Sequence, residues 1–221
     1  MYINTAGIGE ALENFNLSKN RIVPGDALLV SGTIGDHGMA VLSAREGILE
    51  VRSEEGSSEN VGSLNVGADP SARQFGNESC LCSDTASVHR LVEIAHDFAD
   101  EIRFMRDPTR GGVATVLNEI AQNVGFVLES NKIPISPATS SISEILGIDI
   151  LNVACEGRLL LVCSQKVADI ILSRWKETPE GVNASIIGKA TSEKGRVTIR
   201  TITGGTRLVD VPQGELLPRI C

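Results

Sequence analysis

Short apolar runs of strand length alternate along this chain with segments of helical periodicity, and this alternation restricts the folds open to it. The run ALLVSG at 27–32 follows a Pro-Gly-Asp turn, and the run RLLLVC at 158–163 is strongly apolar. Continuous apolar runs of this length are typical of buried strands. Between them, apolar residues recur at helical spacing over 87–100, which predicts an amphipathic helix. Strands and helices therefore interleave along the chain.

The same alternation continues to the end of the chain, which is rich in strands. The other expected helices cover 39–47, 113–121, 138–146 and 167–175. The other expected strands cover 102–106, 125–130, 184–190, 196–202 and 206–211. In the last helix we expect Ile170, Ile171 and Trp175 to face the core, and Gly204-Gly205 indicates a hairpin turn. The sequence predicts an α+β fold in which helices pack on a mixed β-sheet.

Two stretches lack any period. Residues 52–82 are rich in Gly, Ser, Glu and Asn, so we expect a flexible insertion, which is uncommon inside a compact domain. Residues 212–221 contain two prolines and a glycine, and we expect a mobile tail. Residues 1–211 would then form one domain that carries the insertion.

Composition excludes several classes of protein. The formal net charge of −8 and the pI of about 5.0 argue against nucleic acid as the main partner, because a phosphate backbone needs a basic surface. No apolar run is long enough to cross a membrane, and no signal peptide is evident, so we expect a cytoplasmic protein. The five cysteines are scattered and lack paired zinc-ligand spacing, so we predict no metal site among them.

The segment FMRDPTRGGVATVLNEIA places glycines and arginines where a helix is expected to begin. The turn Asp107–Thr109 can cap that helix, and Gly111 and Gly112 would let a ligand approach its first backbone N–H groups. With Arg106 and Arg110 beside it, such a helix start is suited to an anion or a phosphate. A capped helix with solvated arginines would show the same pattern, so both interpretations stay open.

Two further positions carry groups that can do chemistry. Asp36 and His37 lie in the glycine-rich turn GTIGDHG, where they could serve acid–base or metal chemistry or simply form the turn. Glu156 comes just before a buried strand, where a carboxylate could be a tuned general base or an ordinary loop residue. Ser83-Asp84 is placed to be the N-cap of the helix at 87–100.

The last residue of the chain is a cysteine. Ten extended residues reach about 33 Å, so a thiol on Cys221 could visit an active site and then another protein. A free thiol is mostly protonated at neutral pH, and the adjacent carboxylate does not change that, so an activating base would have to come from elsewhere. A terminal cysteine without any function is the alternative.

These motifs together resemble the hydrogenase expression/formation proteins of the HypE family. The resemblance covers the chain apart from residues 52–82, and the C-terminal LPRIC is its most specific part. The matching motifs are NTAGIG at 4–9, PGD at 24–26, VSGTIGDHG at 30–38, SD at 83–84, MRDPTRGG at 105–112, LNEIA at 117–121, EG at 156–157, GGTR at 204–207 and LPRIC at 217–221. By itself, DPTRGG would indicate only the wider superfamily of aminoimidazole ribonucleotide synthetases, selenophosphate synthetases and thiamine-phosphate kinases.

The resemblance implies a function for the terminal cysteine. In HypE the partner HypF carbamoylates this sulfur, ATP-dependent dehydration converts the thiocarboxamide to a thiocyanate, and the cyano group passes to iron on HypC-HypD for the [NiFe]-hydrogenase centre. Carried over, Cys221 is the carrier and Glu156 the base that acts on the carbamoyl nitrogen. The resemblance places these residues in the phosphate or nucleotide region: Asp107, Thr109, Arg110, Gly111, Gly112, Asp36 and His37.

The resemblance also implies a fold and a missing part. We expect an AIR synthase-related (PurM-like) C-terminal domain, whereas the N-terminal domain that holds most ligands of ATP and Mg²⁺ is not in this chain. The dehydratase would then need that half, supplied as a separate chain or lost by truncation. A non-catalytic carrier that docks on HypF and HypC-HypD is the alternative, and another kinase or synthetase of the superfamily would have no use for LPRIC.

Overall fold

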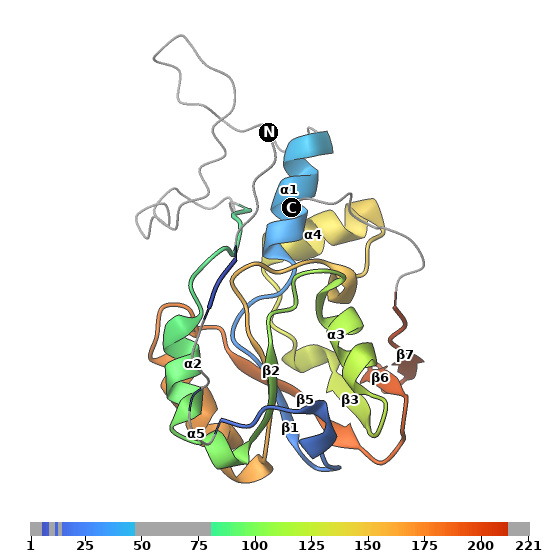
Figure 1. The fold of residues 1–221 in the computed structure, drawn as a ribbon. Coiled ribbons are helices and arrows are strands. Elements are labelled where there is room, and N and C mark those ends of the chain that lie inside the picture. The colour runs from blue at the N-terminus through green and yellow to red at the C-terminus, as the bar shows by residue number, and fades with distance from the viewer. Residues whose placement is uncertain (1–5, 9–11, 13–14, 47–80, 212–221) are drawn as a thin grey trace.

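The computed structural model describes residues 6–8, 12, 15–46 and 81–211 (Figure 1). Their strands form a seven-stranded sheet in the order β2-β4-β1-β5-β3-β6-β7. The strands are β1 (Ala27–Val30), β2 (Ile102–Arg106), β3 (Gly125–Glu129), β4 (Leu160–Cys163), β5 (Ser185–Thr191), β6 (Val197–Arg200) and β7 (Thr206–Leu208). The helices are α1 (Asp36–Glu46), α2 (His89–His96), α3 (Gly112–Ile120), α4 (Pro137–Leu146) and α5 (Gln165–Lys176).

The sheet is mixed, as the sequence predicted. Strand β1 pairs antiparallel with both β4 and β5, while β3 pairs antiparallel with β5 and parallel with β6. Strands β6 and β7 form the expected hairpin around Gly204-Gly205. The register pairs Val30 with Leu160, so the end of β1 lies beside the start of β4.

The sheet has helices on both of its faces (Figure 1). Successive strand residues point to opposite faces. In β1, Leu28 and Val30 therefore enter the core formed with α3, while Ala27 and Leu29 enter the core formed with α2 and α5. Helices α1 and α4 lie together at one end of the sheet, around Met39 and Ile142. The loops that leave β1 and enter β4 open toward this end.

The last long helix differs from its predicted orientation. In α5, Ile171 and Trp175 are fully buried, but Ile170 is 50% exposed, so its predicted inward position was wrong. The helix is oriented by Trp175, whose indole Nε1 donates to the carbonyl oxygen of Leu91 at 3.0 Å. That bond joins α5 to α2 on the buried side of α5, and Ile170 lies on another side of the helix.

Both predicted helix caps were wrong. Helix α2 begins at His89 and its N-cap position is Val88, so Asp84 does not cap it. The helix is also shorter than the predicted 87–100. It ends at His96, and the 3₁₀ helix η3 (Ala99–Glu101) follows. Helix α3 is preceded by Gly111 in the left-handed conformation, with no side-chain cap from Asp107 or Thr109. In contrast, α1 begins three residues before its predicted start, at Asp36.

Some predictions lie outside the described residues. They concern the tail at 212–221 with Cys221, and nearly all of the predicted insertion, residues 52–80. In the part of the chain that the structure describes, no helix combines the length and the apolar character needed to cross a bilayer.

Candidate functional site

Polar side chains from distant parts of the sequence meet beyond the paired ends of β1 and β4. The backbone N–H of Ser31 donates to the carbonyl of Leu159 at 3.0 Å, and the N–H of Leu159 donates to Ser31 Oγ at 2.9 Å. These bonds continue the ladder past the last strand residues. They bring the turn that contains Asp36 and His37 next to the loop that contains Glu156.

Asp36 is buried at the start of α1 and is surrounded by hydroxyl groups. Its Oδ1 accepts from Ser136 Oγ at 2.7 Å and from Thr139 Oγ1 at 2.5 Å, and its Oδ2 accepts from Thr33 Oγ1 at 2.5 Å. Since Ser136 is also the N-cap of α4, one carboxylate joins the beginnings of two helices. Both carboxylate oxygens of Asp36 accept hydrogen bonds from hydroxyl groups, so Asp36 has a structural role.

His37 is half-buried and is held through one ring nitrogen. Its Nδ1 lies 2.8 Å from Ser83 Oγ and 3.5 Å from Thr85 Oγ1. Ser83 Oγ in turn lies 2.8 Å from Thr85 Oγ1 and accepts from the Thr85 backbone N–H at 3.2 Å. Within the described residues, Nε2 of His37 has no hydrogen-bond partner.

Asp84 supports the loop that carries Glu156. Its side chain is completely buried, and its Oδ1 accepts from the backbone N–H of Glu156 at 3.0 Å. Its Oδ2 has no hydrogen bond within the described residues and lies 3.6 Å from Nε of Arg158. Burial raises the pKa of Asp84, although the Arg158 charge and the Glu156 N–H act in the opposite direction.

Arg158 joins this loop to the turn after β1. Its Nε donates to the carbonyl of Thr33 at 2.8 Å, its Nη2 to Thr33 Oγ1 at 3.2 Å, and its Nη1 to the carbonyl of Gly157 at 3.2 Å. A Cβ on Gly157 would collide with the backbone of Asp84 and Ala86. Glu156 itself, which is half-buried, therefore projects from a backbone that is fixed on both sides.

Cys155, the residue before Glu156, is part of the hydrophobic core. Its thiol is fully buried and accepts from the Gly35 N–H at 3.3 Å, with the Val153 carbonyl 3.7 Å away. Burial raises the pKa of this thiol far above its ordinary value, so it stays protonated and is not a nucleophile.

The turn before α3 reaches the same neighbourhood. The N–H of Cys155 donates to the carbonyl of Pro108 at 3.1 Å, which places the 107–112 turn beside the Glu156 loop. The side chains of Asp107, Thr109 and Arg110 have no hydrogen bond or ion pair within the described residues, so they are available to a ligand.

The two glycines of this turn pack closely. Both have positive φ, 68° for Gly111 and 61° for Gly112, a conformation that glycine adopts without strain. A Cβ on Gly112 would lie 2.5 Å from the carbonyl oxygen of Leu151 and 2.6 Å from that of Val153. Carbonyl oxygens would repel an anion on that side of Gly112, so a phosphate would have to approach from another side.

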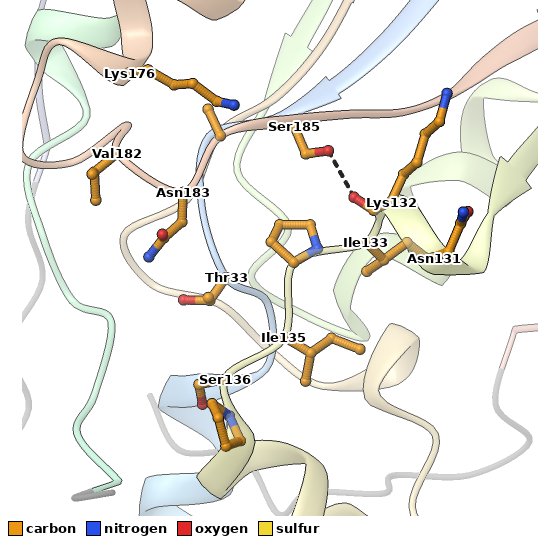
Figure 2. A pocket seen from close by; sticks show the side chains of 13 residues that line it. Thr33, Asn131, Lys132, Ile133, Ile135, Ser136, Lys176, Val182, Asn183 and Ser185 are labelled. Atoms are coloured by element: carbon orange, nitrogen blue, oxygen red, sulfur yellow. Dashed lines mark hydrogen bonds between the residues drawn. The ribbon is translucent and has the colours of Figure 1, made fainter.

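An open pocket of about 500 Å³ lies next to the polar cluster, and Thr33 is one of its lining residues (Figure 2). It is formed by the connection before α4, the connection before β5 and Lys176. Thr33 and Ser136 line it, and both donate to Asp36, so the pocket and the polar cluster share a wall. Figure 2 shows Asn183 and Lys176 along one side of the pocket, and Ser185 bonded to the Lys132 carbonyl at 2.7 Å.

Glu156 and His37 are the two groups singled out in this cluster that could accept a proton from a ligand. The described residues contain no group of three or more His, Cys, Asp or Glu that could hold a metal ion. Sequence reasoning missed the roles of Asp84 and Arg158. The sequence offered little signal for these roles: it indicated Asp84 as a helix cap, and Arg158 is merely two positions after Glu156.

Comparison with known proteins identifies relatives of the whole chain. The carbamoyl dehydratase HypE of Rhizobium leguminosarum bv. viciae is 39% identical over 225 residues, which is all of this chain and 57% of that protein. The crystal structure of a HypE–HypF complex matches 89% of this chain and 56% of its own chain, with a TM-score of 0.74 and 36% identity. A HypE structure in complex with ATP matches 96% of this chain and 58% of its own chain, with a TM-score of 0.76 and 34% identity.

The chain thus spans less than two thirds of the length of the relatives that it matches, and it is similar to HypE throughout its own length. The family model described as "AIR synthase related protein, C-terminal domain" matches residues 23–200, which include the whole sheet except β7 and every residue of the polar cluster. The chain therefore belongs to the AIR synthase-related family, of which it contains the C-terminal domain.

Proposed function

We propose that this chain is the C-terminal part of a HypE-type carbamoyl dehydratase, which makes the cyanide ligand during [NiFe]-hydrogenase maturation. The observation that carries the proposal is the similarity to proteins named carbamoyl dehydratase HypE over the entire chain. The rigid Glu156 loop beside the 107–112 turn supports it, since dehydration needs a fixed base near a phosphate-binding turn.

In the proposed reaction Cys221 carries the carbamoyl group and ATP is the second substrate. The carbamoyl oxygen takes the terminal phosphoryl group, because phosphate leaves far more easily than hydroxide. Glu156 accepts a proton from the carbamoyl nitrogen, and its backbone is kept in place by Asp84. Asp107, Thr109 and Arg110 would border the transferred phosphoryl group.

The Mg²⁺ ion that accompanies ATP would need carboxylate ligands from the protein. Mg²⁺ commonly accompanies ATP and is bound through carboxylates and phosphates. Within the described residues, Asp36 at the start of α1 has both oxygens occupied by hydroxyl donors, so it does not fit as a ligand. We derive no step through Mg²⁺ from this chain and propose that the N-terminal half of the protein holds it.

The partners follow from the same proposal. HypF would carbamoylate Cys221, the HypC-HypD complex would accept the cyano group on its iron, and the work would take place in the cytoplasm. The solved HypE–HypF complex is that of a relative and supports HypF as the first partner. Because the relatives are longer, we propose that this chain alone carries the modified cysteine but does not complete the dehydration.

Mass spectrometry of the C-terminal peptide tests the proposal. With HypF, carbamoyl phosphate and ATP, we expect a mass gain of one carbamoyl group on Cys221, and the loss of one water only when a HypE N-terminal half is added. The Cys221→Ala variant is the control and should gain no mass. Equal modification of that variant and the wild type would refute the assignment.

The same experiment distinguishes the dehydratase from the alternative function, a carrier without catalytic activity. A carrier without catalytic function would be carbamoylated and would bind HypF and HypC-HypD, but no N-terminal half would bring about loss of water from it. The incomplete coverage of the relatives is the observation that keeps this second function in view.

A further inference from the structure

The proposed dehydration removes two protons from one nitrogen. In the first step the carbamoyl oxygen attacks the terminal phosphorus of ATP, ADP leaves, and the nitrogen loses one proton to give an imidate phosphate. In the second step the C–O bond breaks, phosphate leaves with its electron pair, and loss of the remaining N–H proton completes the C≡N bond. One carboxylate would have to release the first proton before it could accept the second.

A second base lies in the same cluster. Nδ1 of His37 lies 2.8 Å from Ser83 Oγ, and Nε2 has no hydrogen-bond partner in the described part of the chain. Ser83 Oγ also lies 2.8 Å from Thr85 Oγ1 and can donate to it. In that arrangement the hydrogen on Nδ1 points to Ser83, and Nε2 keeps a lone pair that can accept a proton.

One pair of adjacent residues holds both bases. Ser83 binds the His37 ring, and the next residue, Asp84, accepts the Glu156 N–H at 3.0 Å. The carboxylates of Asp36 and Asp84 and the guanidinium of Arg158 are the charged groups next to this arrangement, and Asp84 and His37 are close enough to influence each other electrostatically. The sequence separates Ser83 from His37 by 46 positions and Asp84 from Glu156 by 72.

We propose that His37 is the second proton acceptor of the dehydration, and that Ser83 and Asp84 are positioning residues, for His37 and for Glu156 respectively. The inference rests on the proposed function. Neutral imidazole is a stronger base than a carboxylate, so it suits the second step, in which the weaker acid, the imidate N–H, must lose its proton. Glu156 then acts in the first step, together with phosphoryl transfer.

The test uses this chain combined with the N-terminal half of a HypE relative. His37→Asn keeps a hydrogen-bonding group near the position of Nδ1 and removes the base at Nε2. We expect normal carbamoylation of Cys221 and continued release of ADP, but formation of thiocyanate slowed by about 10²–10⁴-fold. The ratio of ADP to thiocyanate therefore rises, whereas Glu156→Gln stops both products.

Two further readouts distinguish catalysis from a structural role. Added imidazole should restore part of the thiocyanate formation in His37→Ala. Ser83→Ala should lower kcat and leave the KM for ATP unchanged. Ser83→Thr, which keeps the hydroxyl group, should retain most of the rate. An unchanged ratio of ADP to thiocyanate in His37→Asn, or no effect of imidazole on a folded His37→Ala, would overturn the inference. A wild type that never loses water would instead refute the proposed function.

Discussion

At the scale of single residues, the site depends on the buried carboxylate of Asp84, which accepts a hydrogen bond from the backbone N–H of Glu156. Asp84 is completely buried, yet only one of its oxygens accepts a hydrogen bond within the described residues. Burying a charged group is costly, and this cost is what raises its pKa. The position of the Glu156 loop therefore depends on a group that ionises less readily in the folded protein than in the unfolded chain.

The pH dependence of stability should show this cost. Because the pKa of Asp84 is raised above 3.8 in the folded state, its favourable contribution is complete below the unfolded-state pKa and is lost as pH rises through the folded-state pKa. Asparagine does not titrate. We expect the free energy of unfolding of Asp84→Asn, minus that of the wild type, to increase from about pH 4 to pH 7.

Urea denaturation at a series of pH values measures this difference. The exposed Asp169, which has no hydrogen bond or ion pair within the described residues, provides a matched control: the difference between Asp169→Asn and the wild type should stay nearly constant. A difference for Asp84→Asn that is flat or that decreases with pH would contradict the expected direction.

The close packing at Gly157 gives a second prediction at this scale. A Cβ there overlaps the Asp84 carbonyl and the Ala86 nitrogen, which are backbone atoms and cannot rotate away. Forcing a methyl group into such a site costs roughly 1–3 kcal/mol. We expect Gly157→Ala to lower the free energy of unfolding by about this amount in chemical denaturation. Gly7→Ala, with no atom within 4 Å of the new Cβ, should change it by less than about 0.5 kcal/mol.

At the scale of elements, the helices that flank the site are fixed by contacts between them. Asp36 joins the beginnings of α1 and α4 through Ser136 and Thr139. On the face of the sheet that α2 and α5 cover, the bond from Trp175 to Leu91 joins these two helices. Such bonds between elements decide which side of each helix meets the sheet.

Neighbouring isoleucines on α5 test that orientation. Ile171 is fully buried, whereas Ile170 is 50% exposed. Truncation of a buried isoleucine to alanine costs about 2–5 kcal/mol, because it loses apolar contacts and leaves a cavity. We expect Ile171→Ala to lose stability in this range and Ile170→Ala to lose less than about 1 kcal/mol, both measured by urea unfolding. Equal losses would mean that α5 is rotated relative to the structure described.

At the scale of the whole molecule, the chain spans less than two thirds of the length of the relatives that it matches. It spans 57% of the Rhizobium relative, and its described residues offer no group of acidic or histidine side chains for a metal ion. In the proposed reaction, the polar cluster would contribute the bases and the 107–112 turn would border the phosphoryl group. The proposed reaction needs the nucleotide to be held largely by other parts of the protein.

Nucleotide binding should therefore separate the chain from the longer protein. A ligand present at a hundred times its Kd stabilises the folded state by about 2.7 kcal/mol. We expect ATP with Mg²⁺ to leave the thermal unfolding temperature of this chain unchanged and to raise that of a version that includes the N-terminal half. A clear increase for this chain alone would show that it binds the nucleotide by itself.

The sequence by itself determined the class of fold and the kind of element at each place. Periodicity is a local property, so it identified the buried strands at β1 and β4 and the amphipathic helices α3 and α5. Local motifs also indicated the HypE family, which the comparisons support over the whole chain. Glu156 and His37 were chosen from their local setting, and their roles remain predictions.

Only the tertiary structure decided which of these residues meet. The pairing of β1 with β4 brings the loop after one beside the loop before the other, and no local pattern specifies that pairing. For the same reason the sequence took Asp84 for a helix cap and placed Ile170 in the core, whereas the fold uses Asp84 to hold Glu156 and exposes Ile170. Contacts between residues far apart in the chain depend on the order of strands in the sheet, and that order results from the packing of the whole domain.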